Sequence, residues 1–149
     1  YIKHLSKLDW CSLLFKEKPG LFRSHQKLKN FGVSRIVPSK SFFDTLTTEK
    51  IDVVIGSRST ALLESWLGDV PSLGMNVGDE YGQELLARAN ILVANEETEL
   101  EQLVLKSLRL TQKEIRCKAA GIWGSQFDNK NLGFEQKKLE SLLNAKRNR

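Results

Sequence analysis

Short apolar runs alternate with longer amphipathic segments along this chain of 149 residues. The strongest run covers 51–55, where Ile51, Val53, Val54 and Ile55 predict a central strand buried on both faces, as in a parallel sheet. Other apolar runs predict strands at 11–15, 34–37, 71–75 and 91–93. Apolar residues at helical spacing predict helices at 21–31, from 42 through 46, at 61–67, through 85–89, at 96–108, from 111 to about 120 and at 132–143.

Strands that alternate with helices predict βαβ units, with parallel strands and right-handed crossovers. We therefore expect an α/β fold, a Rossmann-like three-layer domain in which helices flank a mostly parallel sheet. Residues 1–9 are expected to form a leading helix or linker, residues 10–130 the domain itself, and residues 131–149 an amphipathic helix packed on it. The chain starts at Tyr1 and not at a methionine, so we expect a fragment or a processed form of a longer protein.

Several residues are suited to begin or end these helices. Gly32 follows a predicted helix, as a C-terminal glycine does. Ser41, with Asp44 three residues later, is predicted to form a capping box, and Thr111 is predicted to cap the helix that follows it.

The sequence from Gly56 to Thr60 joins the 51–55 strand to a helix and has the composition of an anion site. Gly56 is expected to allow a tight turn and to leave room for a ligand. Ser57, Ser59 and Thr60 can cap the helix, whose first amides lack partners within the helix and carry the positive end of its dipole. A phosphate is a ligand that such a turn favours. The same pattern also occurs at strand-to-helix turns with a purely structural role, and this alternative stays open.

Composition excludes several classes of protein. With 40% hydrophobic and 28% charged residues, the chain matches a globular domain and neither a disordered protein nor a fibre. Cys11 and Cys117 are its only cysteines, so we expect no disulfide framework. We expect the protein to be located in a reducing cytoplasm. Its apolar stretches are far shorter than the ~18 residues that span a bilayer, and its first residues show no signal-peptide pattern.

Positive charge is concentrated in the first part of the chain. Residues 1–40 carry nine Lys and Arg against two acids, whereas residues 41–101 carry three against twelve, within a net charge of +5. This distribution suits phosphorylated ligands, polyanions or membrane head groups. We expect a cytoplasmic protein with peripheral contact to the inner face of the membrane through its basic residues, and no nucleic-acid partner, because no known binding module is present.

Residues of catalytic and metal chemistry are sparse. His4 and His25 are expected at the surface, because neither has a serine or cysteine at a spacing suited to a catalytic pair. Trp10, Trp66 and Trp123 are expected in core or interface packing. Two histidines and two distant cysteines predict no transition-metal site.

In an open parallel sheet, ligands bind beyond the carboxyl ends of the strands. Three predicted loops lie there, at 16–20, 56–60 and 76–81. Lys16 and Lys18 in the first loop can add positive charge or hydrogen bonds to a base or phosphate, and Arg58 adds charge in the second. Glu64, one turn into the helix, is expected within reach of ribose hydroxyls. Each of these residues, taken singly, also fits an ordinary surface position.

Taken together, these residues resemble the donor-binding C-terminal lobe of GT-B fold glycosyltransferases, especially enzymes of bacterial capsule, lipopolysaccharide and related surface-polysaccharide synthesis. Those families have a Lys-x-His-Pro-like turn after one strand, and Ser-Thr-x-x-x-Glu after a later strand, followed by a small-residue turn and a proline. The counterparts here are Lys16 to Pro19 and Ser59 to Glu64, with Gly68 and Pro71 after them. Lys18 stands where those families have histidine. The loop with Asp79 and Glu80 is similar to the acidic loop that often approaches the donor sugar.

The resemblance implies a lobe that binds a nucleotide-activated sugar and needs no metal, because the helix start, Arg58 and Lys16 would stabilise the leaving diphosphate. It implies phosphate contacts from Lys16, Lys18, Gly56, Ser57, Arg58, Ser59 and Thr60, and ribose or sugar contacts from Glu64, Asp79 and Glu80. The acceptor site and its general base would belong to a missing N-terminal lobe, so this chain alone is expected to bind nucleotide weakly and to catalyse nothing. Two alternatives stay open: half of a UDP-sugar 2-epimerase, and a non-catalytic adaptor that has lost its donor.

Overall fold

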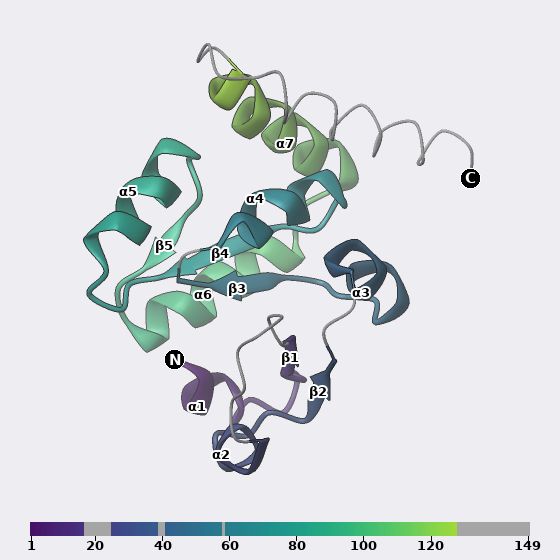
Figure 1. Ribbon diagram of the computed structural model, residues 1–149, viewed down its shortest axis with the longest axis vertical. Coiled ribbons are helices and arrows are strands. Elements are labelled where there is room, and N and C mark those ends of the chain that lie inside the picture. The colour runs from purple at the N-terminus through teal and green to yellow at the C-terminus, as the bar shows by residue number, and fades with distance from the viewer. Residues whose placement is uncertain (17–24, 39–40, 58, 128–149) are drawn as a thin grey trace.

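The computed structural model describes residues 1–16, 25–38, 41–57 and 59–127, and every structural statement below concerns these residues. Helices and strands alternate as far as α6, and a second helix, α7, follows it directly (Figure 1). The elements are α1 (Ile2–Leu5), β1 (Leu14–Lys16), α2 (His25–Asn30), β2 (Arg35–Val37), α3 (Phe42–Thr48), β3 (Val54–Gly56), α4 (Thr60–Leu67), β4 (Ser72–Met75), α5 (Glu80–Arg88), β5 (Val93–Ala94), α6 (Glu97–Leu108) and α7 (Gln112–Phe127). The predicted helix at 132–143 and the proposed boundary at residue 131 lie outside the described residues.

The strands form two parallel sheets, which confirms the predicted α/β class. β1 pairs with β2, and the other three strands pair in the order β3-β4-β5. The central strand of the larger sheet is therefore β4, and the prediction that the 51–55 run forms the central strand is wrong. An apolar run reports how deeply a strand is buried but not which strands pair with it. Cys11 and Leu13, just before β1, pack in the same cluster as Val53 and Ile55, so the two sheets share part of one core.

Helices cover both faces of the three-stranded sheet (Figure 1). On one face, α4, α5 and α7 bury Leu62, Leu63, Trp66, Leu86, Ile115 and Ile122. On the other face, α1 and α6 enclose Leu5, Leu73, Ala94, Leu100 and Val104. Val54 joins the first cluster whereas Val53 and Ile55 join the second, as the alternation of side chains along a strand requires. The expected three-layer arrangement is confirmed, and β3 packs on both of its faces.

Four helices end with the same backbone motif. The second residue after α2, α3, α4 and α5 has a positive φ in each case: Gly32, Lys50, Asp69 and Asn90. The next residue is apolar, and its N–H donates to the carbonyl five residues earlier, as from Val33 to Leu28 at 3.2 Å and from Ile91 to Leu86 at 2.9 Å. These are Schellman motifs, which turn the chain from a helix into the next strand. Gly32 was predictable because it is glycine, whereas Lys50, Asp69 and Asn90 carry no such signal.

One predicted capping box is wrong, and a similar motif occurs at α7. Ser41 is the N-cap of α3, but its side chain makes no capping hydrogen bond. Asp44 lacks the length of the glutamate that normally reaches back in this motif. Before α7, the Thr111 amide donates to Glu114 Oε2 at 2.8 Å and the Thr111 hydroxyl donates to it at 2.7 Å. These hydrogen bonds lower the pKa of Glu114.

A buried hydrogen-bond network holds α4 against β4. Trp66 Nε1 donates to Ser72 Oγ at 2.9 Å, and the Ser72 hydroxyl donates to the Leu62 carbonyl at 2.6 Å. Ser65 Oγ donates to the same carbonyl at 3.0 Å. Trp66, Ser65 and Ser72 are each at most 2% exposed. Because buried polar groups need partners, this network specifies how α4 lies on the sheet.

Ser72→Ala is expected to lower the free energy of unfolding by about 1–3 kcal/mol, because it leaves the Trp66 indole N–H buried without an acceptor. Urea denaturation of the variant and the parent measures the change. Ser12→Ala is the matched control, since Ser12 is exposed, and its effect should stay within about 0.5 kcal/mol. In a Trp66→Phe background the cost of Ser72→Ala should shrink. An unchanged cost there would contradict the role given to the indole hydrogen bond.

Candidate functional site

The turn from β3 into α4 has a well-defined N-cap. Ser59 has extended backbone angles, and its Oγ accepts a hydrogen bond from the Ala61 amide at 3.2 Å. The Leu62 amide donates to the Ser59 carbonyl at 3.0 Å. Two of the first amides of α4 therefore already have partners inside the protein. The Ser59 hydroxyl still has its own proton to donate, because a hydroxyl can accept and donate at once.

The hydroxyls of this turn lie at the carboxyl end of β3. Ser57 directly follows the strand and is half-buried, as Ser59 is, whereas Thr60 is the first residue of α4 and is exposed. Glu64 lies one turn further along α4 and is half-buried. Arg58 falls outside the described residues. Three residues with hydroxyls therefore lie within four positions of one another at this helix start, and Glu64 lies four residues after Thr60, where helical residues share a face.

Acidic residues distinguish the start of α4 from the other helix starts nearby. The first turn of α4 contains no acid, whereas α3 has Asp44, α5 has Glu80, α6 has Glu97 and Glu99, and α7 has Glu114. A carboxylate in the first turn already interacts with the positive end of the helix dipole and repels a second anion. Among the helices from α3 to α7, α4 is therefore the one whose start best suits an anionic ligand.

Gly56 does not play the part that its sequence position suggests. It is the last residue of β3, pairs with Gly74, and is not among the glycines with positive φ, which in the described chain are Gly32 and Gly78. A β-carbon at this position would lie 3.4 Å from Leu62 Cδ2, which is an ordinary contact on the core side of the strand. The expected tight turn at Gly56 is wrong, because this residue has strand backbone that other residues also adopt, whereas its expected phosphate contact stays a prediction.

The remaining predicted residues that the structure describes lie in two other places. Lys16 is the last residue of β1, in the two-stranded sheet, so strand pairing does not place it beside the β3–α4 turn. Lys18 falls outside the described residues. Asp79 is the N-cap of α5 and makes no side-chain capping bond, and Glu80 is the first residue of that helix. Since β3 and β4 are neighbours in register, the loop with Asp79 and Glu80 follows the strand next to the hydroxyl turn.

The loop between β4 and α5 is held by a residue that sequence reasoning did not single out. Asn76 Oδ1 accepts hydrogen bonds from the Gly78 amide at 3.0 Å and from Gln83 Nε2 at 2.6 Å. Asn76 Nδ2 donates to Asn95 Oδ1 at 2.9 Å, across to the loop after β5. One side chain thus ties together two loops at the carboxyl ends of adjacent strands. An asparagine two residues before a glycine is typical of an Asx turn, and this signal could have identified Asn76.

Helix α1 is docked on α6 by polar contacts, and His4, which was expected at the surface, is partly exposed there and forms one of them. His4 Nε2 lies 2.8 Å from Glu101 Oε2, and the His4 side chain is only 25% exposed. The Tyr1 hydroxyl lies 3.2 Å from the Asn76 carbonyl and 3.1 Å from the Ala94 carbonyl, so it can donate to either. Burial and nearby glutamates raise the pKa of this phenol. The side chain of His25 falls outside the described part of the structure.

The tryptophans and cysteines show no catalytic arrangement. Trp66 is buried in the core, as expected, whereas Trp10 is 46% exposed and the side chain of Trp123 is not described. Burial raises the pKa of the Cys11 thiol, which makes it a poor nucleophile at neutral pH. Cys117 is exposed. Within the described ranges, no three His, Cys, Asp or Glu residues cluster as metal ligands would.

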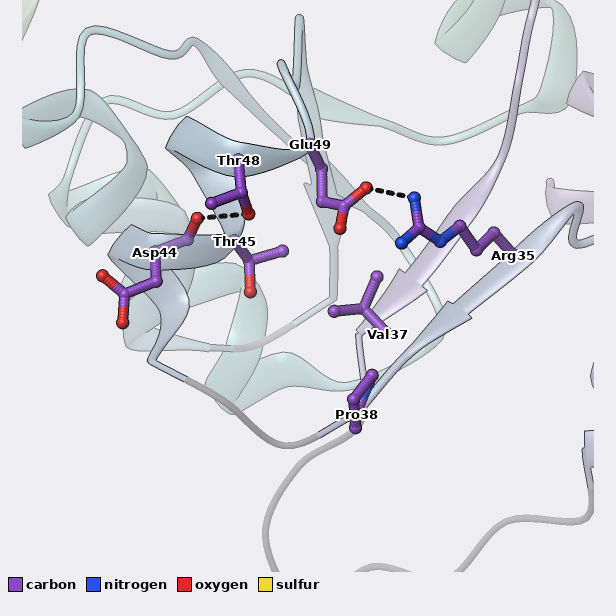
Figure 2. Close-up of a pocket in the computed structure, with 7 residues that line it drawn as sticks. All are labelled: Arg35, Val37, Pro38, Asp44, Thr45, Thr48 and Glu49. Carbon is purple, nitrogen blue, oxygen red and sulfur yellow. Dashed lines mark hydrogen bonds and ion pairs between the residues drawn. The ribbon is translucent and has the colours of Figure 1, made fainter.

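A separate cleft of about 320 Å³ lies between α3 and β2. Figure 2 shows Val37 and Pro38 facing Thr45 and Glu49 across it, with the Asp44 carboxylate pointing away. Arg35, the cation in its lining, is paired with Glu49 at 2.6 Å. The Thr45 and Thr48 hydroxyls donate to the carbonyls of Ser41 and Asp44. Because Glu49 neutralises Arg35 and both threonine hydroxyls already donate to backbone carbonyls, the cleft is poorly suited to a phosphate. None of the predicted donor-binding residues lines it.

Comparison with protein-family models, with curated proteins and with solved structures found no match for this chain. Among the described residues, no helix is both long and apolar enough to cross a bilayer. A functional assignment therefore depends on the chemistry of the residues described above.

Proposed function

We propose that this chain is the donor-binding lobe of a nucleotide-sugar-dependent glycosyltransferase, and that the β3–α4 turn binds the diphosphate of the donor. The observation that carries the proposal is the start of α4, which combines three hydroxyls with a first turn free of acids. It lies at the carboxyl end of a strand in a parallel sheet, where ligands of open α/β folds bind.

The chemistry of the turn fits a diphosphate leaving group. The Ser59 hydroxyl accepts from Ala61 and can donate its own proton to a phosphate oxygen. Thr60 can donate a second hydrogen bond, and the eight-residue helix α4 adds its positive dipole end. These groups stabilise negative charge as it develops on the diphosphate when the sugar leaves. Asp79 and Glu80, after the neighbouring strand, would accept hydrogen bonds from sugar hydroxyls.

In this proposal, the acceptor substrate and the general base come from a second lobe, as the resemblance to GT-B enzymes implies. The chain by itself therefore binds a nucleotide or nucleotide-sugar and does not transfer the sugar. We also propose that donor binding needs no metal, because the helix start, together with Arg58 between Ser57 and Ser59 in the sequence, would supply the positive charge that a divalent ion otherwise provides.

Nucleotide binding tests this function directly. UDP, CDP or a CMP-linked sugar at about ten times its dissociation constant should stabilise the chain by about 1.4 kcal/mol, measured as a rise in melting temperature. Ser59→Ala combined with Thr60→Val should abolish this ligand-induced rise. Because loss of the Ser59 cap itself costs about 1 kcal/mol, the comparison uses the rise with ligand and not the melting temperature alone.

Thr98→Val provides the matched control, because Thr98 is exposed in the first turn of α6, which carries Glu97 and Glu99. This variant should keep the full ligand-induced rise. If the double variant binds nucleotide as well as the parent does, the phosphate assignment is wrong. If no nucleotide at millimolar concentration stabilises the parent chain, the domain is better explained as an adaptor without a donor.

A further inference from the structure

The charges of the described residues divide between two ends of the protein. Residues 1–16 and 25–38, which contain α1, β1, α2 and β2, carry six Lys and Arg against one acid, a net charge of +5. Residues 41–57 and 59–127 carry seven Lys and Arg against thirteen acids, a net charge of −6. We call the first group the basic end, and it lies at the bottom of Figure 1, below the three-stranded sheet. Positive charge concentrated at one end favours the approach of that end to an anionic surface.

Helix α2 contributes two lysines that form no ion pair with any described acid. Leu28 is only 6% exposed and faces the core, whereas Lys27 and Lys29 beside it are exposed. Neither lysine forms an ion pair within the described chain, whereas Arg35 is paired with Glu49. Lys3 and Lys7 of the leading segment are exposed as well. The positive charge of the basic end is therefore carried mainly by solvent-exposed lysines.

Two large apolar side chains accompany these lysines. Trp10 is 46% exposed and Phe31, directly after α2, is 50% exposed. The two segments that carry them pack together, because a β-carbon on Gly32 would lie 2.2 Å from Ser6 Cβ and the Ser34 amide donates to the Leu13 carbonyl at 2.9 Å. The exposed aromatic residues and the exposed lysines therefore belong to the same end of the fold.

We propose that the basic end docks on an anionic lipid surface, with Trp10 and Phe31 entering the headgroup region and the lysines above the lipid phosphates. Aromatic side chains prefer the membrane–water interface, and clustered lysines are attracted to anionic leaflets. Over the full sequence, residues 1–40 carry nine Lys and Arg against two acids, whereas residues 41–149 carry 14 against 16. The surface therefore attracts the basic end more strongly than the rest of the chain. Lysine fits this role as a generic charge, whereas nucleic-acid recognition relies more on the planar guanidinium of arginine.

Sedimentation with lipid vesicles tests the docking. The full chain should bind vesicles of phosphatidylcholine with one quarter phosphatidylglycerol, bind vesicles of pure phosphatidylcholine far more weakly, and be released by 0.5 M salt, at which the screening length is only about 4 Å. Lys27→Glu with Lys29→Glu should weaken binding by roughly 25-fold or more, on the basis of about fivefold per lysine. Trp10→Ser with Phe31→Ser should also weaken binding at low salt, although this variant leaves the net charge unchanged.

A matched control keeps the test specific. Tyr81→Ser with Lys113→Glu alters an aromatic residue that is 69% exposed and an exposed lysine, both outside the basic end. This control should bind vesicles as the parent does. Equal binding to both vesicle types, no binding at all, or an equal loss in the control would overturn the proposal. Competition with a short RNA would also overturn it. If the RNA displaces the chain from vesicles and the same lysine variants lose RNA binding, the surface is a nucleic-acid site.

Discussion

Gly32→Ala is expected to destabilise the protein by about 3 kcal/mol or more, the largest effect of a single added methyl group that this structure indicates. Two costs combine at this position. Gly32 has φ +82°, where a β-carbon is unfavourable, and that carbon would lie 2.2 Å from Ser6 Cβ and 2.3 Å from Ser6 Oγ. The contact is between α1 and the end of α2, so the backbone of one segment must move. Urea denaturation measures the loss.

Gly78→Ala separates these two costs. Gly78 has φ +76°, but no atom lies within 4 Å of the added β-carbon, so this variant should lose only the backbone term of about 1–2 kcal/mol. In a Ser6→Gly background, the penalty of Gly32→Ala should fall toward the value for Gly78→Ala. Equal losses for the two alanine variants in the parent would show that the close approach of α1 and α2 does not exist in solution.

Leu100→Ala should lower the free energy of unfolding by about 2–5 kcal/mol, because it leaves a cavity in a fully enclosed site. Leu100 is 0% exposed and packs with Leu5, Leu73 and Val104, where α1, β4 and α6 meet. Thermal or urea unfolding measures the change.

The control for Leu100 lies on the same helix. Leu108 is the last residue of α6 and is 46% exposed, so Leu108→Ala should change stability by no more than about 0.5–1 kcal/mol. Similar losses for the two variants would mean that α6 is not packed on the three-stranded sheet as described. A large loss of stability for Leu100→Ala alone would support the described packing of α1 and α6 on the three-stranded sheet.

Much of the fold was predictable because local patterns determine local structure. The β-branched run at 51–55 marks β3, and the apolar spacing after Ala61 marks α4. Ser59 was predicted as a helix cap, and its hydroxyl oxygen accepts a hydrogen bond from the Ala61 amide. Each of these features depends on residues within one turn or one strand, so a single stretch of sequence contains the information.

The candidate site was predictable only in part. The hydroxyls of the β3–α4 turn are adjacent in sequence, and their grouping follows from that adjacency. The position of Lys16 in a different sheet from the β3–α4 turn depends on strand pairing between distant segments, and so does the hydrogen bond from Asn76 to Asn95. A polar residue in a loop gives no sign of which other loop it contacts, so sequence reasoning did not identify Asn76.

The amino-acid sequence by itself determined the α/β class, most helix and strand positions, the hydroxyl-rich turn and the concentration of lysines in the first forty residues. Only the tertiary structure decided that β4 and not β3 is central, that His4 is tied to Glu101, and that Gly32 must be glycine to pass Ser6. The physical reason is range. Periodicity, capping and charge act between neighbours along the chain, whereas strand order, ion pairs and close backbone contacts arise between segments that meet only after folding.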